Sequence, residues 1–416
     1  MEIQLPKEVE EIIGRLNEAG FEAYAVGGCV RDTLLGRVPG DWDITTSAMP
    51  MDVKHIFKRT VDTGIQHGTV TVLMHGTGYE VTTYRIDGEY EDGRHPKSVT
   101  FTSNLLEDLK RRDFTINAMA YSHISGIVDA FEGQQDLAEK RIRCVGNATE
   151  RFTEDALRIL RAVRFAGQLG FVIDLDTYQA MREIAPNLSH VSKERILTEL
   201  LKLLNSAHPE HLLDVWDTNM ASYITQDFPK IFSQTDRKEL EMCLLRIAQL
   251  PPRQHMRIAA VCSHLKSGEV KKILVDLKAD NDTIKKSSVL VRMLDEPILT
   301  DKPSIRKKLS EVGPELFLDY LQVKYLLLHG PTDCEDKKCV WEQEKKLTEE
   351  ILKDQDCISL QMLKVNGGDL IKAGMKPGKA MGEMLQELLE MVFQEPSKND
   401  KEQLLEIVRE RLENEK

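Results

Sequence analysis

The sequence predicts an α/β domain at the N-terminal end, followed by a longer part that is almost entirely helical. Up to about residue 140, short β-rich runs alternate with turns that are rich in Gly, Pro and Asp. From about residue 150 onward, apolar residues recur at the three- and four-residue spacing of amphipathic helices. The chain has 416 residues, and roughly 150 residues per domain predicts about two to four domains.

The α/β part is predicted to open with one amphipathic helix, because apolar residues recur at helical spacing over residues 7–19. These apolar residues are Val9, Ile12, Ile13 and Leu16. The β-rich runs that follow are expected to form strands. They cover residues 23–26, 41–45, 68–74, 80–84, 99–102 and 127–130.

The helical part contains two strongly patterned segments. Residues 154–165 carry an apolar stripe along one side of a single predicted helix. A second helix is predicted from residue 193, with Ser192 as its N-cap. The polar residues 329–338 are the best candidate for a linker, and the chain is helical again from residue 341.

The composition describes a soluble globular protein, with 41% hydrophobic and 30% charged residues. Its 56 Lys and Arg residues against 68 Asp and Glu residues give a net charge of −12. This charge counts against a basic surface that covers the whole molecule, but it does not exclude local basic strips.

Cysteine usage points to a reducing compartment. The seven cysteines are scattered and form no CxxC pair, so we expect free thiols and a cytoplasmic location. The N-terminal residues lack the pattern of a signal peptide, and no apolar run approaches about 18 residues. Neither secretion nor a membrane span is therefore expected.

The run Asp41-Trp42-Asp43 is the sharpest local signal. In a strand, residues i and i+2 point to the same face, about 6.6 Å apart. Two carboxylates on one face can bind two divalent cations, and Mg²⁺ prefers hard oxygen ligands together with substrate phosphates. Glu80, in a nearby predicted strand, is a candidate third carboxylate. Each of these acids taken alone reads more simply as an exposed surface residue.

A glycine turn precedes the carboxylate pair, since residues 25–32 read as a strand, the turn Gly27-Gly28 and the start of a helix. Glycine lets the backbone approach a phosphate closely, and a helix N-terminus offers free N–H donors. Arg31 is placed one helical turn in, where it can pair with a triphosphate. Alone, this is an ordinary connection, but beside the carboxylate pair it indicates phosphoryl or nucleotidyl transfer. The sequence motifs of P-loop NTPases and protein kinases are absent.

The predicted helix over residues 154–165 carries an acid and an arginine that can read a base. Asp155 and Arg158 are i,i+3 neighbours, so an amine of the base can donate to the acid while the arginine donates to the adjacent ring acceptor. This pattern fits cytosine and adenine and leaves unpaired groups against guanine and uracil. On an unbroken helix Arg164 lies about 180° from Asp155, so Arg161 is the better placed of the two for the nucleotide. The alternative is a solvated ion pair.

A dense cationic run, Lys110-Arg111-Arg112-Asp113, follows the predicted strand over residues 99–102. Its cations suit phosphate neutralisation, and its acid suits contact with a ribose hydroxyl. Taken alone, a run of charges is usually a solvated face.

Four motifs together resemble the class II tRNA nucleotidyltransferases, or CCA-adding enzymes, which share a polymerase-β-like head with bacterial poly(A) polymerases. In chain order the motifs are Gly27-Gly28-x-Val30-Arg31-Asp32, Gly40-Asp41-Trp42-Asp43, the run from Arg111 to Ala118, and Glu154-Asp155-x-x-Arg158-x-x-Arg161. The resemblance covers nearly the whole chain. Each motif alone is weak, and the four in the family's order are highly specific.

The resemblance implies an α/β polymerase-β-like nucleotidyltransferase head followed by an all-α neck, body and tail. The expected boundaries are residues 1–140 for the catalytic head, 141–205 for the base-recognising neck, 206–338 for the helical body and 339–416 for the tRNA-binding tail.

The resemblance also implies roles for single residues. Asp41 and Asp43 are the expected catalytic residues and Mg²⁺ ligands. The residues expected to contact the incoming nucleotide are Gly28, Arg31, Arg112, Asp113, Asp155, Arg158, Arg161 and Arg164. Among them, Asp155 and Arg158 are expected to read the base, and Asp113 to contact the sugar.

The implied activity is template-independent addition of CCA to the 3′ end of tRNA, using CTP and ATP and releasing pyrophosphate. Residues 85–96 resemble the flexible head loop that enzymes adding only CC lack, which favours full CCA addition. The alternatives are a CC-adding or A-adding enzyme, a poly(A) polymerase, and, more distantly, a non-catalytic RNA-binding protein. The intact pair of Asp41 and Asp43 counts against the last of these. No protein partner is expected.

Overall fold

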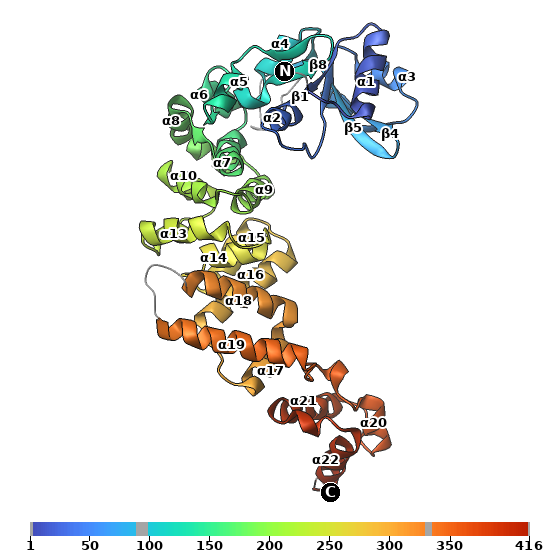
Figure 1. The fold of residues 1–416 in the computed structure, drawn as a ribbon, viewed down its shortest axis with the longest axis vertical. Helices are drawn as coiled ribbons and strands as arrows, with labels where there is room; N and C mark the ends of the chain where they lie inside the picture. The colour runs from blue at the N-terminus through green and yellow to red at the C-terminus, as the bar shows by residue number, and fades with distance from the viewer. Residues whose placement is uncertain (1–2, 89–98, 329–334, 415–416) are drawn as a thin grey trace. The chain divides into compact units, whose positions relative to one another are not determined.

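The computed structural model describes residues 3–88, 99–328 and 335–414. The chain forms two compact units: unit 1 holds residues 1–232 and 276–279, and unit 2 holds residues 233–275 and 280–416. The α/β part lies in unit 1, and unit 2 is helical in its described residues, so the predicted fold class is confirmed (Figure 1). The finer division into head, neck, body and tail stays a prediction.

Unit 1 is built on a seven-stranded mixed sheet in the order β3-β4-β5-β2-β1-β8-β9. Its strands are β1 Ala23–Val26, β2 Ile44–Thr46, β3 Thr60–Gly64, β4 Thr69–Met74, β5 Thr77–Thr83, β8 Met119–Ser122 and β9 Gly126–Asp129. In this sheet β2 and β5 pair in parallel, and the other neighbours pair antiparallel. Two smaller sheets pair β6 Arg85–Asp87 with β7 Val99–Phe101, and β10 Arg141–Ile142 with β11 Val172–Ile173.

Each predicted strand overlaps an observed one, but the strand predicted over residues 41–45 is wrong at its start. β2 begins at Ile44, so Asp41 and Asp43 precede it. The N–H of Val26 still donates to the carbonyl oxygen of Asp43 at 3.0 Å, which extends the pairing of β1 and β2 by one residue. Asp43 is therefore fixed to the sheet by its backbone. Strands β3, β6, β8, β10 and β11 were not predicted.

The helices of unit 1 begin with α1 Lys7–Glu18, which confirms the helix predicted over residues 7–19. Its apolar stripe, including Val9 and Leu16, is buried, and the helix packs against β1. The other helices are α2 Gly28–Leu34, α3 Pro50–Ile56, α4 Leu105–Lys110, α5 Gly133–Ala138, α6 Ala148–Glu154, α7 Leu157–Leu169, α8 Leu175–Ile184, α9 Lys193–Leu204, α10 Leu212–Asp217, α11 Ala221–Ile224 and α12 Lys230–Ser233. Short 3₁₀ turns cover Ile65–His67, Thr115–Asn117, Ala185–His190 and Pro209–His211.

The single helix predicted over residues 154–165 is broken. α6 ends at Glu154, Asp155 has the extended angles φ −145° and ψ 101°, and α7 begins at Leu157. α7 packs against α9, and α6 packs against α8. Ser192 stands at the N-cap position of α9 as predicted, but its side chain makes no capping hydrogen bond.

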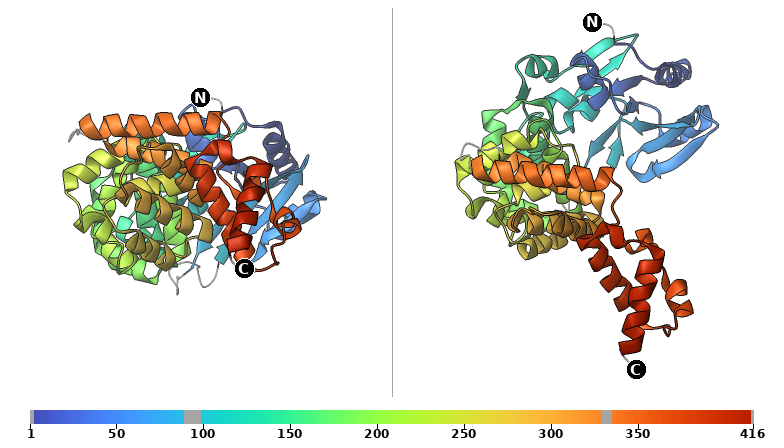
Figure 2. Two further views of the ribbon diagram at one scale, coloured as in Figure 1. Left: turned by 90° about the horizontal axis from the view of Figure 1, so that it is seen from below. Right: turned by 60° about the horizontal axis from the view of Figure 1, so that its bottom comes forward.

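Unit 2 consists of helices in its described residues (Figure 2). They are α13 Arg237–Ile247, α14 Gln254–Val261, α15 Ser267–Asp276, α16 Asn281–Asp295, α17 Lys302–Val312, α18 Pro314–Leu328, α19 Glu335–Lys353, α20 Gly367–Lys372, α21 Lys379–Gln394 and α22 Lys401–Asn414, with 3₁₀ turns at Leu360–Met362 and Pro396–Lys398. The last three helices share an apolar cluster that includes Leu370, Leu388 and Val408.

Two sequence predictions fall on residues outside the described ranges. Residues 89–96 of the predicted head loop and residues 329–334 of the predicted linker are among them. Residues 335–338 form the first turn of α19, so the linker prediction is wrong there. Among the described helices, none is both long and apolar enough to cross a membrane.

Candidate active site

The predicted metal-binding carboxylates gather where β2 and β5 lie side by side. The parallel register pairs Ile44 with Val81. Asp43 and Glu80 each precede these residues by one position, so they lie opposite each other at the starts of neighbouring backbone segments about 4.8 Å apart. The charges of Asp41 and Glu80 both act on the carboxyl of Asp43. The structure thus places the other two acids within electrostatic reach of Asp43.

Desolvation and nearby negative charges disfavour the ionised form of the Asp43 carboxyl. Desolvation by the surrounding protein is the largest cause that raises its pKa from an ordinary 3.8 to about 6, even though the residue as a whole is exposed. The negative charges of Asp41 and Glu80 add to this rise, and the positive charge of Arg112 opposes it. In the described part of the chain, none of the three acids forms an ion pair, which leaves negative charge that a cation would relieve.

This ligand set fits a divalent metal only in part. Within residues 3–88, 99–328 and 335–414, no three His, Cys, Asp or Glu side chains converge closely enough to hold a metal ion by themselves. Mg²⁺ usually keeps several waters and binds through one or two carboxylates plus substrate phosphates. The pair of Asp41 and Asp43, without an ion-pair partner among the described residues, provides such a partial set, which a bound triphosphate would complete.

The glycine turn depends on Gly27. This residue has φ 82° and ψ −127°, a conformation that residues with a Cβ rarely adopt. A Cβ there would also lie 3.0 Å from Nη1 of Arg112. Gly28 is the first residue of α2, and its Cβ would lie at an ordinary 3.7 Å from Nη2 of Arg31. The turn therefore requires Gly27, which was not among the predicted nucleotide contacts, more strictly than Gly28.

Arg31 is held from two sides. Its Nε and Nη2 donate to the two carboxylate oxygens of Asp32, both at 2.9 Å. Its Nη1 donates to Oδ1 of Asn117 at 2.7 Å, and Nδ2 of Asn117 donates to Asp113 at 3.2 Å. The guanidinium also lies over the ring of Phe165, 5.1 Å from its centre. The glycine turn and α7 are thus linked through buried polar groups.

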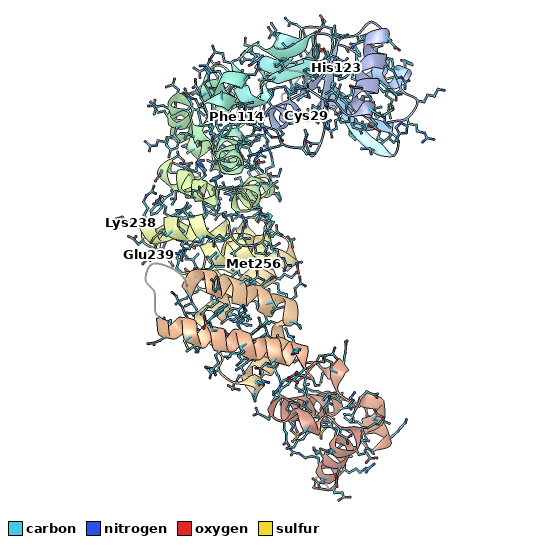
Figure 3. The ribbon with its side chains drawn as sticks, in the orientation of Figure 1. Cys29, Phe114, His123, Lys238, Glu239 and Met256 are labelled. Carbon is cyan, nitrogen blue, oxygen red and sulfur yellow. The ribbon has the colours of Figure 1, made fainter. Side chains whose placement is uncertain are left out.

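Three arginines converge on Phe165. The guanidinium carbons of Arg31, Arg161 and Arg164 lie 5.1, 5.4 and 3.8 Å from the ring centre. Phe114, labelled in Figure 3, packs edge to face against the same ring at 5.7 Å. Burial lowers the pKa of Arg164 to about 10, although the charge of the nearby Glu199, with Nε and Oε2 2.6 Å apart, opposes this.

The argument that favoured Arg161 over Arg164 loses its basis, because it counted angles along one unbroken helix from Asp155, and the preference for Arg161 stays a prediction. The break before α7 removes that reference. Within α7 the two arginines are three residues apart and share a side of the helix.

Asp113 is already occupied by neighbouring donors. Nε and Nη2 of Arg161 donate to its Oδ2 at 2.8 and 2.6 Å, and the N–H of Phe114 donates to its Oδ1 at 2.9 Å. Burial alone would raise the pKa of Asp113, but the charges of Arg161 and Arg158 outweigh it and lower the pKa to about 2. The geometry thus makes Asp113 an anchor for Arg161.

The ion pair between Asp155 and Arg158, which was the alternative to base reading, does not form. Nη2 of Arg195 donates to Asp155 at 2.7 Å, and Nη1 of Arg158 donates to Glu154 at 2.6 Å. Nη2 of Arg158 also donates to the carbonyl oxygen of Arg111 at 3.2 Å. Each residue of the predicted base-reading pair is thus held by a different partner, and both stay partly exposed.

Several residues that shape the site were missed as site residues: Gly27, Asp108, Asn117, Phe165, Arg195 and Glu199. Gly27 and Asn117 lie within motifs that the sequence already showed, so both could have been named as site residues from the sequence. Asp108 and Glu199 are buried acids, and nothing in the local sequence shows which arginine each one meets. Arg195 contacts Asp155 across 40 positions of sequence, a distance that no local pattern reveals.

Carboxylates at a strand end, a glycine turn and a cluster of arginines are the arrangement of an enzyme that transfers a nucleotidyl group from a nucleoside triphosphate. Comparison with known families agrees. Residues 23–143 match the poly A polymerase head domain, residues 170–231 match an RNA and SrmB- binding site of polymerase A, and residues 253–408 match a tRNA nucleotidyltransferase domain 2.

The relatives are similar over nearly the whole chain. The CCA-adding enzyme of Limosilactobacillus fermentum is 40% identical over 410 residues, which cover 96% of each chain. That of Ligilactobacillus salivarius is 39% identical over 409 residues, covering 98% of this chain and 97% of the relative. This chain belongs to the family of CCA-adding enzymes, which are tRNA nucleotidyltransferases.

Solved structures show the same fold. The CCA-adding enzyme of Bacillus stearothermophilus in complex with CTP matches with a TM-score of 0.81 and 33% identity, over 99% of both chains. The Thermotoga maritima CCA-adding enzyme complexed with tRNA matches with a TM-score of 0.62 and 22% identity, over 99% of this chain and 100% of that chain. Nucleotidyltransferases of this family use a divalent metal ion.

Proposed function

We propose that this protein adds CCA to the 3′ end of tRNA from CTP and ATP, without a nucleic-acid template, and that Mg²⁺ is its metal. The observation that carries the proposal is the carboxylate pair Asp41 and Asp43, which has no ion-pair partner among the described residues, beside Arg112 and the glycine turn. The relatives of this chain are CCA-adding enzymes over nearly its whole length.

In the proposed reaction, the 3′-hydroxyl oxygen of the tRNA attacks the α-phosphorus of the nucleoside triphosphate. A new P–O bond forms, the bond between the α-phosphorus and the bridging oxygen breaks, pyrophosphate leaves, and the proton of the hydroxyl passes to solvent. Asp41 and Asp43, with Glu80 beside them, would hold the metal ions. When bound, these ions would polarise the phosphate and favour ionisation of the attacking hydroxyl. Arg31 and Arg112 would offset the negative charge of the triphosphate. Arg112 would do so from its place beside Gly27 in the glycine turn.

Base selection is proposed to rest on Asp155 and Arg158. An acid accepting from an exocyclic amine and an arginine donating to the adjacent ring nitrogen match C and A but not G or U. The separate partners of the two side chains support this role, because each is held in place without being neutralised by the other. Arg161 and Arg164, gathered with Arg31 on Phe165, are proposed to add positive charge beside the nucleotide.

Substrate handling extends the proposal to the rest of the chain. The neck, residues 141–205, would present the base-reading residues, while the body and the tail would bind tRNA. A cytoplasmic location follows from a tRNA substrate, and the described cysteines, which are all free thiols, are consistent with it.

The test compares Asp43→Asn with a matched surface control, Asp62→Asn. Asp62 is exposed on β3 of the same sheet and pairs with Lys54 at 2.8 Å. With labelled CTP and Mg²⁺, Asp43→Asn should lose incorporation while retaining tRNA binding in a filter assay, and Asp62→Asn should match the wild type. Full activity of Asp43→Asn would overturn the assignment of the catalytic pair.

A further inference from the structure

Asp108, at the C-terminal half of α4, is a fully buried carboxylate with 0% exposure. Nε and Nη2 of Arg111 approach its Oδ1 at 2.9 and 2.8 Å. The hydroxyl of Thr45 donates to its Oδ2 at 3.1 Å, and Nη2 of Arg112 donates to the same oxygen at 3.4 Å. The backbone N–H of Arg85 completes the set at 3.4 Å. One buried acid thus receives donors from several segments of the head.

One branch of this network leads to the catalytic carboxylates and the glycine turn. Thr45 lies in β2, two residues after Asp43. Arg112 reaches from Asp108 to Gly27, where a Cβ would meet its Nη1 at 3.0 Å, and its charge also acts on Asp43. Nε of Arg112 is buried without a hydrogen-bond partner in the described part of the chain. Arg112 therefore stands between Asp108 and the proposed triphosphate site.

The other branch leads to the residue proposed to read the base. With the side chain of Arg111 fixed on Asp108, its carbonyl oxygen accepts a hydrogen bond from Nη2 of Arg158 at 3.2 Å. Burial alone would raise the pKa of Asp108, but the charges of Arg111 and Arg112 and the hydrogen bonds outweigh it and lower the pKa below its ordinary value. Asp108 is thus the anion to which both arginines are tied.

We propose that Asp108 is a positioning residue for nucleotide binding: its buried carboxylate aims Arg112 at the triphosphate and, through Arg111, supports Arg158 beside the base. This inference rests on the proposed function. Charge-assisted hydrogen bonds to a buried acid fix guanidinium groups more firmly than bonds to a neutral amide. Without that charge, Arg112 has Asp43 as a nearby anion, and it would compete there with the divalent metal.

The experiment is Asp108→Asn in the full-length chain, with initial rates of CTP incorporation measured on a tRNA that ends at the discriminator base. The KM for CTP should rise about tenfold, as expected when a buried charged partner is lost. The half-saturating Mg²⁺ concentration should also rise severalfold, because Arg112 then competes for Asp43. The KM for tRNA should stay within about twofold of the wild type. A role in stability alone would move neither the CTP nor the Mg²⁺ dependence.

The matched control is Asp136→Asn. Asp136 is 2% exposed and, like Asp108, accepts from a threonine hydroxyl and an arginine: Thr115 at 2.6 Å and Nε of Arg143 at 2.8 Å. None of these three residues is among the proposed nucleotide contacts. The control should lose thermal stability to a similar degree and keep the wild-type KM for CTP and the wild-type Mg²⁺ dependence.

If Asp108→Asn does not fold, Thr45→Val provides the test. It removes one hydrogen bond to Asp108 and should raise the KM for CTP about threefold, a loss of the size of one such bond. Wild-type CTP and Mg²⁺ constants in the folded variant would overturn the inference, as would equal changes in Asp136→Asn. A wild-type chain that incorporates no nucleotide would instead overturn the proposed function.

Discussion

Replacing Gly27 by alanine should damage both stability and nucleotide binding, for two separable reasons. Its φ of 82° with ψ of −127° is strained for any residue with a Cβ. That Cβ would also stand 3.0 Å from Nη1 of Arg112, closer than such contacts normally come, so the guanidinium must move. The first effect acts on folding, and the second acts on Arg112, a proposed contact of the triphosphate.

The expected magnitude follows from the backbone. A conformation of this kind costs about 2 kcal/mol, and in a unit of this size that lowers the Tm by about 4–8 °C. Calorimetry gives the Tm, and steady-state incorporation of CTP gives the KM, which should rise as Arg112 is displaced.

Two other glycines of unit 1, Gly20 and Gly28, provide the controls. Gly20→Ala has a φ of 89° but meets no atom within 4 Å, so it should lose stability and keep the KM for CTP. Gly28→Ala lacks the strained angle, and its Cβ meets Arg31 at 3.7 Å, so its Tm should stay within about 2 °C of the wild type. Equal Tm values for Gly27→Ala and Gly28→Ala would refute the strain argument. An unchanged KM for Gly27→Ala would refute the contact with Arg112.

Three further predictions follow from charge. Because the pKa of Asp43 is raised to about 6, ionisation of this carboxyl destabilises the metal-free native state increasingly between about pH 4 and pH 6. In EDTA, Asp43→Asn should therefore have a higher Tm than the wild type at pH 7 and the same Tm at pH 4. A lower Tm for Asp43→Asn at pH 7 would contradict this prediction. Because the pKa of Asp113 is lowered to about 2, its pairing with Arg161 contributes about 2 kcal/mol to the free energy of unfolding above about pH 4, and this contribution is lost as the pH falls toward 2. Urea titrations of the wild type and Asp113→Asn should therefore show a difference in unfolding free energy that shrinks over this range. Arg195→Ala frees Asp155, so the ratio of correct to incorrect nucleotides incorporated should fall about tenfold, and an unchanged ratio would remove Arg195 from base selection.

Sequence periodicity predicted those elements that have one buried face. The apolar residues of α1 repeat at helical spacing because one side of this helix packs on the sheet, and all of its stripe is buried. Strand β8, with four buried residues, was missed, whereas the equally buried β1 was predicted from its β-rich composition rather than from periodicity. A strand covered on both faces has no alternation of polar and apolar residues from which it could be predicted.

The break at Asp155 shows why helix geometry alone misplaced the residues that were predicted to read the base. No Gly or Pro marks the position, and the arginines around it favour a helix. The side chain of Asp155 accepts a hydrogen bond from the N–H of Leu157 at 3.1 Å and another from the distant Arg195. The first bond is a known preference of Asp at helix starts, whereas the second exists only in the folded chain.

The candidate site was predictable in its residue types and not in its pairings. Asp41, Asp43 and Glu80 were named from their chemistry, and the register of β2 and β5 then gave the reason that Asp43 lies beside Glu80. Which acid holds which arginine depends on contacts between segments far apart in the sequence, as in the pairing of Arg164 with Glu199. The net charge of −12 is compatible with an RNA substrate because cations gather locally around Phe165.

The most direct test of the proposed activity is incorporation into a tRNA that ends at its discriminator base, with Mg²⁺ and labelled CTP alone, ATP alone, or both. CCA addition predicts two added residues with CTP alone, little or none with ATP alone, and three with both. A product that stops after CC when both nucleotides are present would contradict the proposal in favour of a CC-adding enzyme, and a long A tail with ATP alone would contradict it in favour of a poly(A) polymerase.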